Sequence, residues 1–330
     1  MRAIQYHRFG GYDVLGSATA PEPATPDGWA IVRVALAGVS PLDNTARLGK
    51  LPAGVIKPFP VVPGSSGVGV LVEPGTSGLA VGARVAMGGG GYGLSVDGVW
   101  AELLAVNPRA TSCPSRTPSN DTAAATLTTG AGHLTALFAL TEAAGFRPGQ
   151  AVLAPGVGGA VGQGGVEIAR VLGASHAITT ATSGAKAAKG REAGFEVIDL
   201  TQESLRDGVA RITEGKGVDV VLDGVGGALT GEALGALAVG GSLISIGYSA
   251  GMTGTINVTD LIWRNAHIHG FRFALFTDEQ VAAANVRLLD LLARKEISPI
   301  TDSVFPLAEA ADAQRHLIEG GPFGRVLLAV

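Results

Sequence analysis

The residues of this chain best suited to chemistry are three glycines that share one turn. Gly156, Gly159 and Gly162 follow a short apolar run and precede a helix-like segment, with a G-x-x-G-x-x-G spacing. Glycines in such a turn permit a sharp bend, bring the backbone close to a phosphate and let a helix pack closely on a strand. The helix N-terminus adds unpaired N–H groups and the positive end of its dipole. We therefore predict phosphate contacts at Gly156, Gly159, Ala160, Val161 and Gly162.

The alternative is an ordinary glycine-rich loop, because the chain contains 50 glycines. The segments that follow favour the phosphate site. Strand-like runs recur at 177–180, 196–199, 219–223 and 243–247, with helical segments between them. Repeated strand–helix–strand units build a parallel sheet, which is the setting in which this glycine pattern binds a dinucleotide.

The loop after the second strand bears on which dinucleotide is bound. A site specific for NAD places an Asp or Glu about twenty residues after the glycine turn, where it accepts hydrogen bonds from the ribose. This chain instead reads T-T-A-T-S-G-A-K from Thr179 to Lys186. Thr182 and Ser183 can donate to a 2′-phosphate and Lys186 can neutralise it, so we predict NADPH. The alternative for Lys186 is a solvated charge on a helix face.

The nicotinamide end of the site follows from topology, because ligands bind outside the carboxyl ends of parallel strands. The residues after the later strands should line the ring, although packing at the strand ends is an alternative role for them. They are Val225, Gly226, Ile246, Gly247, Tyr248, Phe271 and Phe273.

The length and the charge of the chain limit the classes of protein to which it can belong. A chain of 330 residues is long enough for two domains. Only 16% of the residues are charged, the net charge is −4, and Lys and Arg form no run, which argues against a nucleic-acid partner. The longest uncharged stretch, 233–259, contains six glycines and reads as buried sheet with its turns, so we expect no membrane span.

Cysteine usage and the N-terminus suggest a compartment. The single cysteine, Cys113, allows neither a disulfide within the chain nor a Cys-rich zinc knuckle. The first residues form no apolar signal-peptide core. We therefore expect a cytoplasmic protein. The mild net charge and the absence of a basic run lead us to expect a small-molecule substrate.

The rest of the chain divides around the dinucleotide region. Short strands punctuated by Gly and Pro run from Met1 to about Asp121, which is typical of a compact β domain. Residues 121–144 are Ala/Thr/Leu-rich with a helical period, and we interpret them as the crossing between domains. Helices are predicted at 279–293 and 307–318, with a closing strand at 325–330.

The order of these elements resembles the medium-chain dehydrogenase/reductase superfamily, and within it the zinc-independent NADPH:quinone oxidoreductase, or zeta-crystallin-like, branch. The likeness covers essentially the full length. It rests on the glycine turn and on P-V-V-P-G at 60–64, G-K-G-V-D-V-V-L-D-G-V-G-G at 215–227, G-G-S-L-I-S-I-G at 240–247 and F-G-R-V-L-L at 323–328.

The resemblance implies an α/β protein of two domains. A GroES-like catalytic domain would comprise residues 1–121 and 271–330. A Rossmann domain, a doubly wound parallel sheet that binds NADPH, would comprise residues 122–270. It also implies a homodimer joined edge to edge through the Rossmann sheets.

The resemblance also implies the absence of a metal. Zinc-dependent members carry cysteine and histidine ligands at places where this chain has Ser40, the pair Ser65 and Ser66, and Ala131. Zinc polarises a carbonyl or alcohol oxygen, so simple alcohol oxidation would lose its electrophile. Quinones and enones need no such metal, because conjugation spreads the charge left after hydride arrives and hydrogen bonds can hold it.

Few side chains need be catalytic in hydride transfer. The substrate-pocket candidates are Ser40, Asp43, Asn44, Thr45, Tyr92, Thr129 and His133, with Thr129 counted among the cofactor contacts. Quinone reductases commonly have Asn in place of Ser40 and Tyr in place of Thr45, so the pocket is reshaped here. Tyr92, His133 or water could donate a proton, although a structural role for His133 and a bracing role for Asp43 stay open. Arg325 matches a basic family position that could reach the cofactor.

Three functions remain open from the sequence. The first is an NADPH-dependent, metal-independent reductase of quinones. The second is a reductase of activated C=C bonds in enones, alkenals or enoyl thioesters, which the same chemistry would serve. The third is a non-catalytic NADPH-binding protein, as the zeta-crystallin resemblance allows.

Overall fold

The computed structural model describes residues 1–108, the backbone of 115–116, and 121–330, so Cys113 lies outside the described residues. The chain forms two compact units. Unit 1 comprises Met1–Gly130 and Thr277–Val330, and unit 2 comprises Ala131–Phe276.

The first boundary between the units lies inside the segment interpreted as a crossing helix, rather than before it. Helix α2 (Asp121–Thr128) packs on strands of unit 1, and the helix is then broken, because Gly130 and Ala131 have φ values of 71° and 49°. The crossing is therefore two helices joined by a left-handed kink. The second boundary follows Phe276, which stacks on Phe138 of unit 2 at a ring separation of 4.1 Å.

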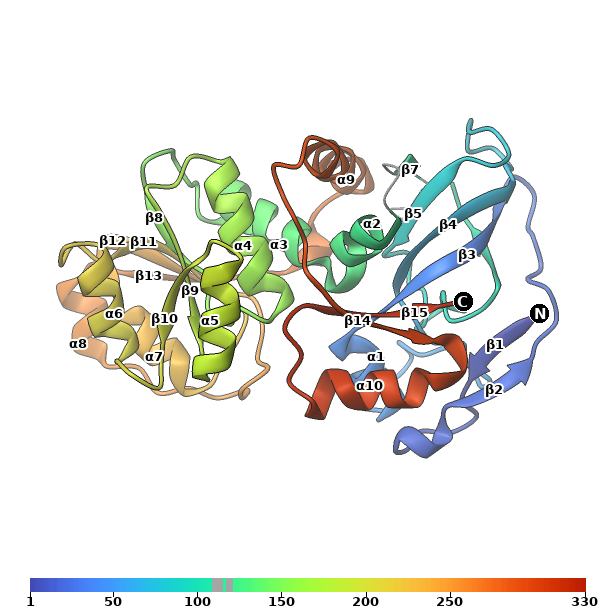
Figure 1. The fold of residues 1–330 in the computed structure, drawn as a ribbon, viewed down its shortest axis with the longest axis horizontal. Coiled ribbons are helices and arrows are strands. Elements are labelled where there is room, and N and C mark those ends of the chain that lie inside the picture. The colour runs from blue at the N-terminus through green and yellow to red at the C-terminus, as the bar shows by residue number, and fades with distance from the viewer. Residues whose placement is uncertain (109–114, 117–120) are drawn as a thin grey trace. The chain divides into compact units, whose positions relative to one another are not determined.

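Unit 1 is built around one sheet that joins strands from the N-terminal region of the chain with its last two strands (Figure 1). The strand order is β14-β15-β3-β4-β5-β7, with β6 also paired to β3 and β1 paired to β2 as a separate hairpin. The closing strand β15 lies antiparallel to β3, so the C-terminus completes the sheet begun by the N-terminal region. The elements are β1 (Arg2–Gln5), β2 (Gly16–Thr19), β3 (Ala30–Val39), α1 (Pro41–Arg47), β4 (Ser66–Glu73), β5 (Arg84–Gly88), β6 (Leu103–Val106), β7 (Ser115–Arg116), α2, α9 (Asp278–Ala293), β14 (Thr301–Pro306), α10 (Ala310–Glu319) and β15 (Arg325–Ala329).

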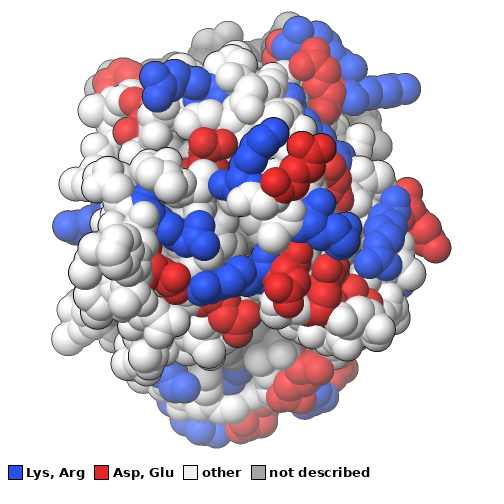
Figure 2. Space-filling model, turned by 90° about the vertical axis from the view of Figure 1, so that its left-hand side faces the viewer, with Lys and Arg blue, Asp and Glu red and all other residues white. Residues whose placement is uncertain are grey.

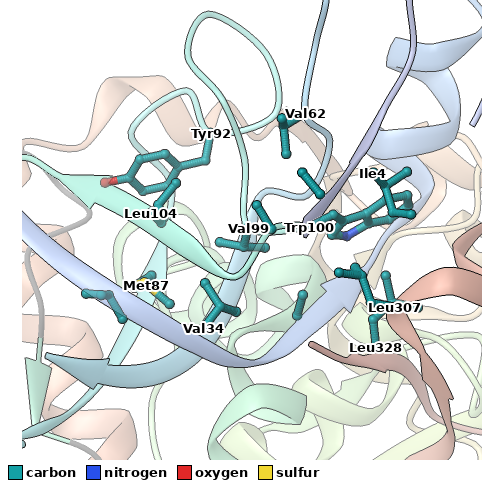
Figure 3. Packing of buried hydrophobic residues seen from close by; sticks show 14 of the residues in the cluster. Ile4, Val34, Val62, Met87, Tyr92, Val99, Trp100, Leu104, Leu307 and Leu328 are labelled. Atoms are coloured by element: carbon teal, nitrogen blue, oxygen red, sulfur yellow. The ribbon is translucent and has the colours of Figure 1, made fainter. Parts of the chain in front are cut away.

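The core of unit 1 forms around Trp100, which is completely buried (Figure 3). Side chains from both chain ends, including Ile4 and Leu328, lie in the same cluster. The indole Nε1 of Trp100 donates to the carbonyl oxygen of Gly38 at 2.9 Å, which satisfies its one polar group. Trp100 thus anchors β3 just before the loop that carries Ser40.

Unit 2 is a parallel sheet whose successive strands are connected along the chain by helices (Figure 1). The strand order β10-β9-β8-β11-β12-β13 shows that the chain winds first to one side of β8 and then to the other. The elements are α3 (Gly132–Phe138), β8 (Ala151–Leu153), α4 (Ala160–Val171), β9 (His176–Ala181), α5 (Gly184–Glu192), β10 (Glu196–Asp199), α6 (Leu205–Ile212), β11 (Val218–Asp223), α7 (Ala228–Leu234), β12 (Leu237–Ser245), α8 (Val258–Trp263) and β13 (His267–Gly270).

The GroES-like and Rossmann classes expected from the sequence are therefore both present. The strand expected at 243–247 begins earlier, at Leu237, and ends at Ser245, so Gly247 lies in the turn beyond it. The helix expected at 307–318 is a 3₁₀ turn at Leu307–Glu309 followed by α10.

One apolar stretch and the distribution of surface charge complete the description. The stretch Asp121–Ala143 is long and apolar enough to cross a membrane, but 78% of its most apolar window is buried inside the structure, as in the core helices of globular proteins. On the face shown in Figure 2, basic and acidic side chains are interspersed without a large patch of one sign.

Candidate functional site

The glycine turn directly follows β8 and is held by the neighbouring strand β9. Gly156 has a φ of 90°, which favours glycine. Its N–H donates to Thr180 Oγ1 at 3.1 Å, and the N–H of Val157 donates to the Thr180 carbonyl oxygen at 2.8 Å. A Cβ on Gly162 would clash with the carbonyl oxygen of Gly156, so the first turn of α4 lies directly against this bend. The backbone thus forms a cradle at a helix N-terminus.

One task that the sequence assigned to the motif glycines falls to another residue. A Cβ on Gly165 would clash with the Cβ of Ala154 on the sheet and lie 3.2 Å from a methyl group of Leu222. Gly165 therefore allows the close packing of α4 on the strands, while Gly162 allows its packing on the turn. Both contacts bring the N-terminus of α4 toward the end of β8.

The turn after β11 meets the glycine turn at the point where the chain changes direction across the sheet. A Cβ on Gly224 would lie 2.9 Å from the Cβ of Val161, and a Cβ on Gly156 would lie 3.5 Å from Val225 Cγ2. Strands β8 and β11 are neighbours, with the windings of the chain leaving to opposite sides. Open parallel sheets bind their ligands at this switch point.

Asp223 shapes this second turn, a role that the sequence reading missed. Its Oδ1 accepts from the N–H groups of Val225 at 3.0 Å and Gly226 at 2.8 Å, and its Oδ2 accepts from Thr230 Oγ1 at 2.6 Å. The carbonyl oxygen of Asp223 accepts from the N–H groups of Ile246 and Gly247. The signal was present as an acidic residue at the end of an apolar strand, followed by G-V-G-G.

The structure brings most of the predicted nicotinamide residues to one sheet edge. The bonds to Asp223 place Val225, Gly226, Ile246 and Gly247 together, and the N–H of Phe271 donates to the Ser245 carbonyl oxygen at 2.9 Å. Tyr248 also lies after β12, with an exposed side chain.

Phe273 packs against an aromatic ring of the same unit. Its ring lies 6.0 Å from that of Phe138 in a T-shaped arrangement. This is the packing role that the sequence reading left as the alternative.

The loop after β9 begins helix α5. Ser183 is the N-cap, and its Oγ accepts from the N–H of Lys186 at 3.3 Å, which leaves the hydroxyl hydrogen able to donate to a ligand. Thr182 is exposed, and Lys186 lies in the first turn of α5. The three residues predicted for a 2′-phosphate therefore lie on one turn.

The carboxylate of Asp199, which is distant in the sequence, lies beside this loop in the structure. Strand β10 pairs with β9 so that Asp199 lies beside Ala181, and its Oδ2 is 3.7 Å from the position of a Cβ on Gly184. Its Oδ1 accepts from the Thr201 hydroxyl at 2.7 Å and the Thr201 N–H at 3.0 Å. The Thr201 hydroxyl contributes most to lowering the pKa of Asp199, which stabilises the charged form. Asp199 was not predicted from the sequence, because it lies well beyond the twenty residues after the glycine turn and reaches this loop only through the pairing of β10 with β9.

In unit 1, Asp43 braces the loop that carries Ser40. The N–H and the hydroxyl of Ser40 both donate to Asp43 Oδ2 at 2.7 Å, which closes the start of α1. Burial raises the pKa of Asp43 to about 6, although these hydrogen bonds oppose the rise. Thr45 and Asn44 both lie in α1. Thr45 Oγ1 donates to the Pro41 carbonyl oxygen in the first turn of this helix at 3.0 Å.

Three further predicted site residues of unit 1 are buried. Tyr92 belongs to the same hydrophobic cluster as Trp100 and lies beside Leu104 (Figure 3). Thr129 packs against Gly38 of β3, and its hydroxyl donates to the Ala125 carbonyl oxygen at 2.7 Å. Arg325 lies in β15.

His133, the remaining candidate, belongs to unit 2 and is paired. Its Nε2 lies 2.6 Å from Glu167 Oε2, and both side chains are buried. No group of three or more His, Cys, Asp or Glu side chains suited to a metal ion occurs among the residues that the structure describes.

Comparison with known proteins places this site in a family. Residues 26–116 match the alcohol dehydrogenase GroES-like domain, and residues 160–289 match the zinc-binding dehydrogenase family. The human synaptic vesicle membrane protein VAT-1 homolog is 28% identical over 353 residues, spanning 99% of this chain and 86% of that protein. The quinone oxidoreductase of Pongo abelii is 27% identical over 333 residues, spanning 99% of this chain and 97% of that protein.

A solved structure of an NAD-dependent alcohol dehydrogenase is 27% identical, with a TM-score of 0.87 over the whole of both chains. The fold and the glycine turn thus define a two-domain oxidoreductase with a dinucleotide-binding domain. The chain belongs to the medium-chain dehydrogenase/reductase superfamily, as its resemblance implied, and is similar within it to the quinone oxidoreductases.

The contact between Gly162 and the Gly156 carbonyl oxygen generates a first prediction. Gly162→Ala forces the start of α4 away from the turn, so we expect the Kd for a nicotinamide dinucleotide to rise by about tenfold or more, which corresponds to a cost of about 1–3 kcal/mol. Titration of NADPH fluorescence measures this. Gly16→Ala is the control, since the nearest atom to its added Cβ is 4.0 Å away. An unchanged Kd for Gly162→Ala would contradict the assignment of the cradle.

The raised pKa of Asp43 generates a second prediction. The folded state favours the protonated carboxyl, so this contribution to the free energy of unfolding is present below about pH 3.8 and is lost as the pH rises through about 6. The side chain of the Asp43→Asn variant cannot titrate. We therefore expect the free energy of unfolding of the variant, relative to that of the wild type, to increase by up to about 3 kcal/mol between about pH 4 and pH 7. Urea unfolding across this pH range measures the difference, and a difference independent of pH would refute the cause given.

Proposed function

We propose that this protein is an NADPH-dependent reductase that transfers hydride to a quinone without a metal. The observation that carries the proposal is the backbone cradle at Gly156–Gly162, which lies at the switch point of a parallel sheet and is followed by a loop with Lys186 in the first turn of its helix. The similarity to a quinone oxidoreductase over 99% of the chain supports the choice of substrate.

The residues present suit a bound NADPH. The first-turn N–H groups of α4 would hold the pyrophosphate, because they lie at the N-terminus of a helix whose start is packed against the backbone bend at Gly156 through Gly162. Thr182, Ser183 and Lys186 would bind the 2′-phosphate. The turns after β11 and β12, fixed by Asp223, would hold the nicotinamide end.

The chemistry needs little from the side chains of the protein. NADPH supplies the hydride, and addition of one proton then completes the hydroquinone. The buried Asp223 holds two turns in place through five hydrogen bonds, three to its carboxylate and two to its carbonyl oxygen, so the nicotinamide end meets a rigid surface. Tyr92 is packed in a hydrophobic cluster and His133 is bonded to Glu167, so we propose that the proton comes from water rather than from either.

The preference for NADPH depends on the balance between Lys186 and Asp199. Lys186 attracts a 2′-phosphate, whereas a charged Asp199 beside the same turn opposes it and could instead accept from a ribose hydroxyl. Use of NADH is therefore the rival for the cofactor, and the NAD-dependent alcohol dehydrogenase of similar structure favours it. We propose that Lys186 prevails, since Asp199 is already bonded to Thr201.

Variants of these two residues test the cofactor proposal. Lys186→Ala should raise the Kd for NADPH by about tenfold and leave that for NADH unchanged, since one charge-assisted contact is worth about 1.5 kcal/mol. Asp199→Asn should strengthen NADPH binding relative to NADH, because it removes the opposing charge. Fluorescence titration with each cofactor gives both ratios. Equal weakening for the two cofactors in Lys186→Ala would show that the residue does not read the 2′-phosphate.

The substrate is tested by NADPH consumption with an aromatic ortho-quinone and a linear 2-enone side by side, after subtraction of the non-enzymatic rate. We expect the quinone to be reduced faster. Preference for the enone would assign the protein to the reductases of activated C=C bonds. Tight binding of NADPH without turnover of either compound would favour a non-catalytic binding protein.

A further inference from the structure

Helices α3 and α4 of unit 2 touch through their backbones. A Cβ on Gly132 would clash with the carbonyl oxygen of Ala160, the first residue of α4, and a Cβ on Gly164 would lie 2.6 Å from the backbone nitrogen of His133. The start of α3 thus presses on the first turn of α4. Small shifts of α3 therefore move the turn that forms the cradle.

A buried polar pair joins the same two helices next to this contact. His133 Nε2 and Glu167 Oε2 are 2.6 Å apart, and the two residues are only 1% and 8% exposed. The hydrogen bond fixes the orientation of the imidazole ring relative to the carboxyl group, whichever of the two atoms carries the proton. The surrounding residues of α3 are mainly apolar, with Leu134, Leu137 and Phe138 buried.

Stability alone does not account for such a pair. Burying two polar groups costs desolvation, and well-packed apolar side chains of similar volume are often as stable or more so. A buried pair can instead specify register, because a shift of one helix along the other would break the hydrogen bond and leave buried polar groups unsatisfied. Here the register is that of α3 on α4.

The other end of α3 is fixed to the strand-end aromatic residues. Phe138 stacks on Phe276 at 4.1 Å with an interplanar angle of 11°, and Phe276 contacts the ring of Phe271 at 5.7 Å. Phe271 follows β13, at the edge assigned to the nicotinamide. One short helix therefore links the cradle to the far end of the proposed site.

We propose that His133 and Glu167 are positioning residues for the dinucleotide: their hydrogen bond sets the register of α3 on α4 and thereby holds the first turn of α4 in its binding geometry. This inference rests on the proposed dinucleotide site. It assigns His133 a role through α4 rather than as a proton donor to substrate.

The test replaces the pair with apolar side chains of similar size, His133→Leu together with Glu167→Met. We expect the double variant to fold with a Tm equal to or above that of the wild type. Its Kd for NADPH should rise about tenfold, because loss of the register displaces the first-turn N–H groups of α4 that hold the pyrophosphate. Glu167→Gln keeps an acceptor for Nε2, so it should retain the wild-type Kd. Ser204→Ala, which removes the N-cap of α6 elsewhere in unit 2, should lower Tm without changing the Kd.

Hydrogen exchange of the unliganded protein gives a second reading that needs no cofactor. We expect faster exchange of the peptide spanning Gly156–Gly165 in the double variant than in the wild type or in Glu167→Gln. Unchanged exchange together with an unchanged Kd would overturn the inference. A wild type that binds neither NADPH nor NADH would refute the proposed function, and the exchange result would still decide whether the pair sets the helix register.

Discussion

The nucleotide-binding unit depends on one steric constraint, the contact of the first turn of α4 with the carbonyl oxygen of Gly156. Gly162 must lack a side chain for that contact to form, and Gly156 must adopt a positive φ. Thr180 of the next strand fixes the turn through two hydrogen bonds. Gly165 and Gly224 then let the helix approach the sheet and the neighbouring turn. Backbone packing, rather than any charged side chain, thus prepares the helix N-terminus for an anion.

Buried polar groups do the remaining organisation, which is notable in a chain with only 16% charged residues. Asp223 joins the turns after β11 and β12, Asp43 closes the loop at Ser40, and His133 meets Glu167 between two helices. Each makes hydrogen bonds that offset the cost of burial and fix a local geometry. They position backbone rather than perform chemistry, which suits a reaction that asks mainly for alignment.

Local signals in the sequence predicted the parallel sheet with its glycine turn, and the family resemblance supplied the assignment of both chain ends to a GroES-like domain. The glycine turn, the alternation of strands and helices and the closing strand all appear in chain order, and the structure contains them. What the sequence could not supply depends on sheet order and on side-chain direction. Asp199 reaches the loop after β9 only because β10 lies beside β9. The burial of Tyr92 and the partner of His133 depend in the same way on residues distant in the chain.

The central claim is that the backbone cradle at Gly156–Gly162 binds the pyrophosphate of a nicotinamide dinucleotide. A crystal structure of the protein with NADPH tests it most directly. The account predicts pyrophosphate oxygens within hydrogen-bond distance of the first-turn N–H groups of α4, and the 2′-phosphate beside the first turn of α5. A dinucleotide bound away from the carboxyl ends of β8 and β11, or a crystal grown at saturating NADPH with nothing bound, would contradict the claim.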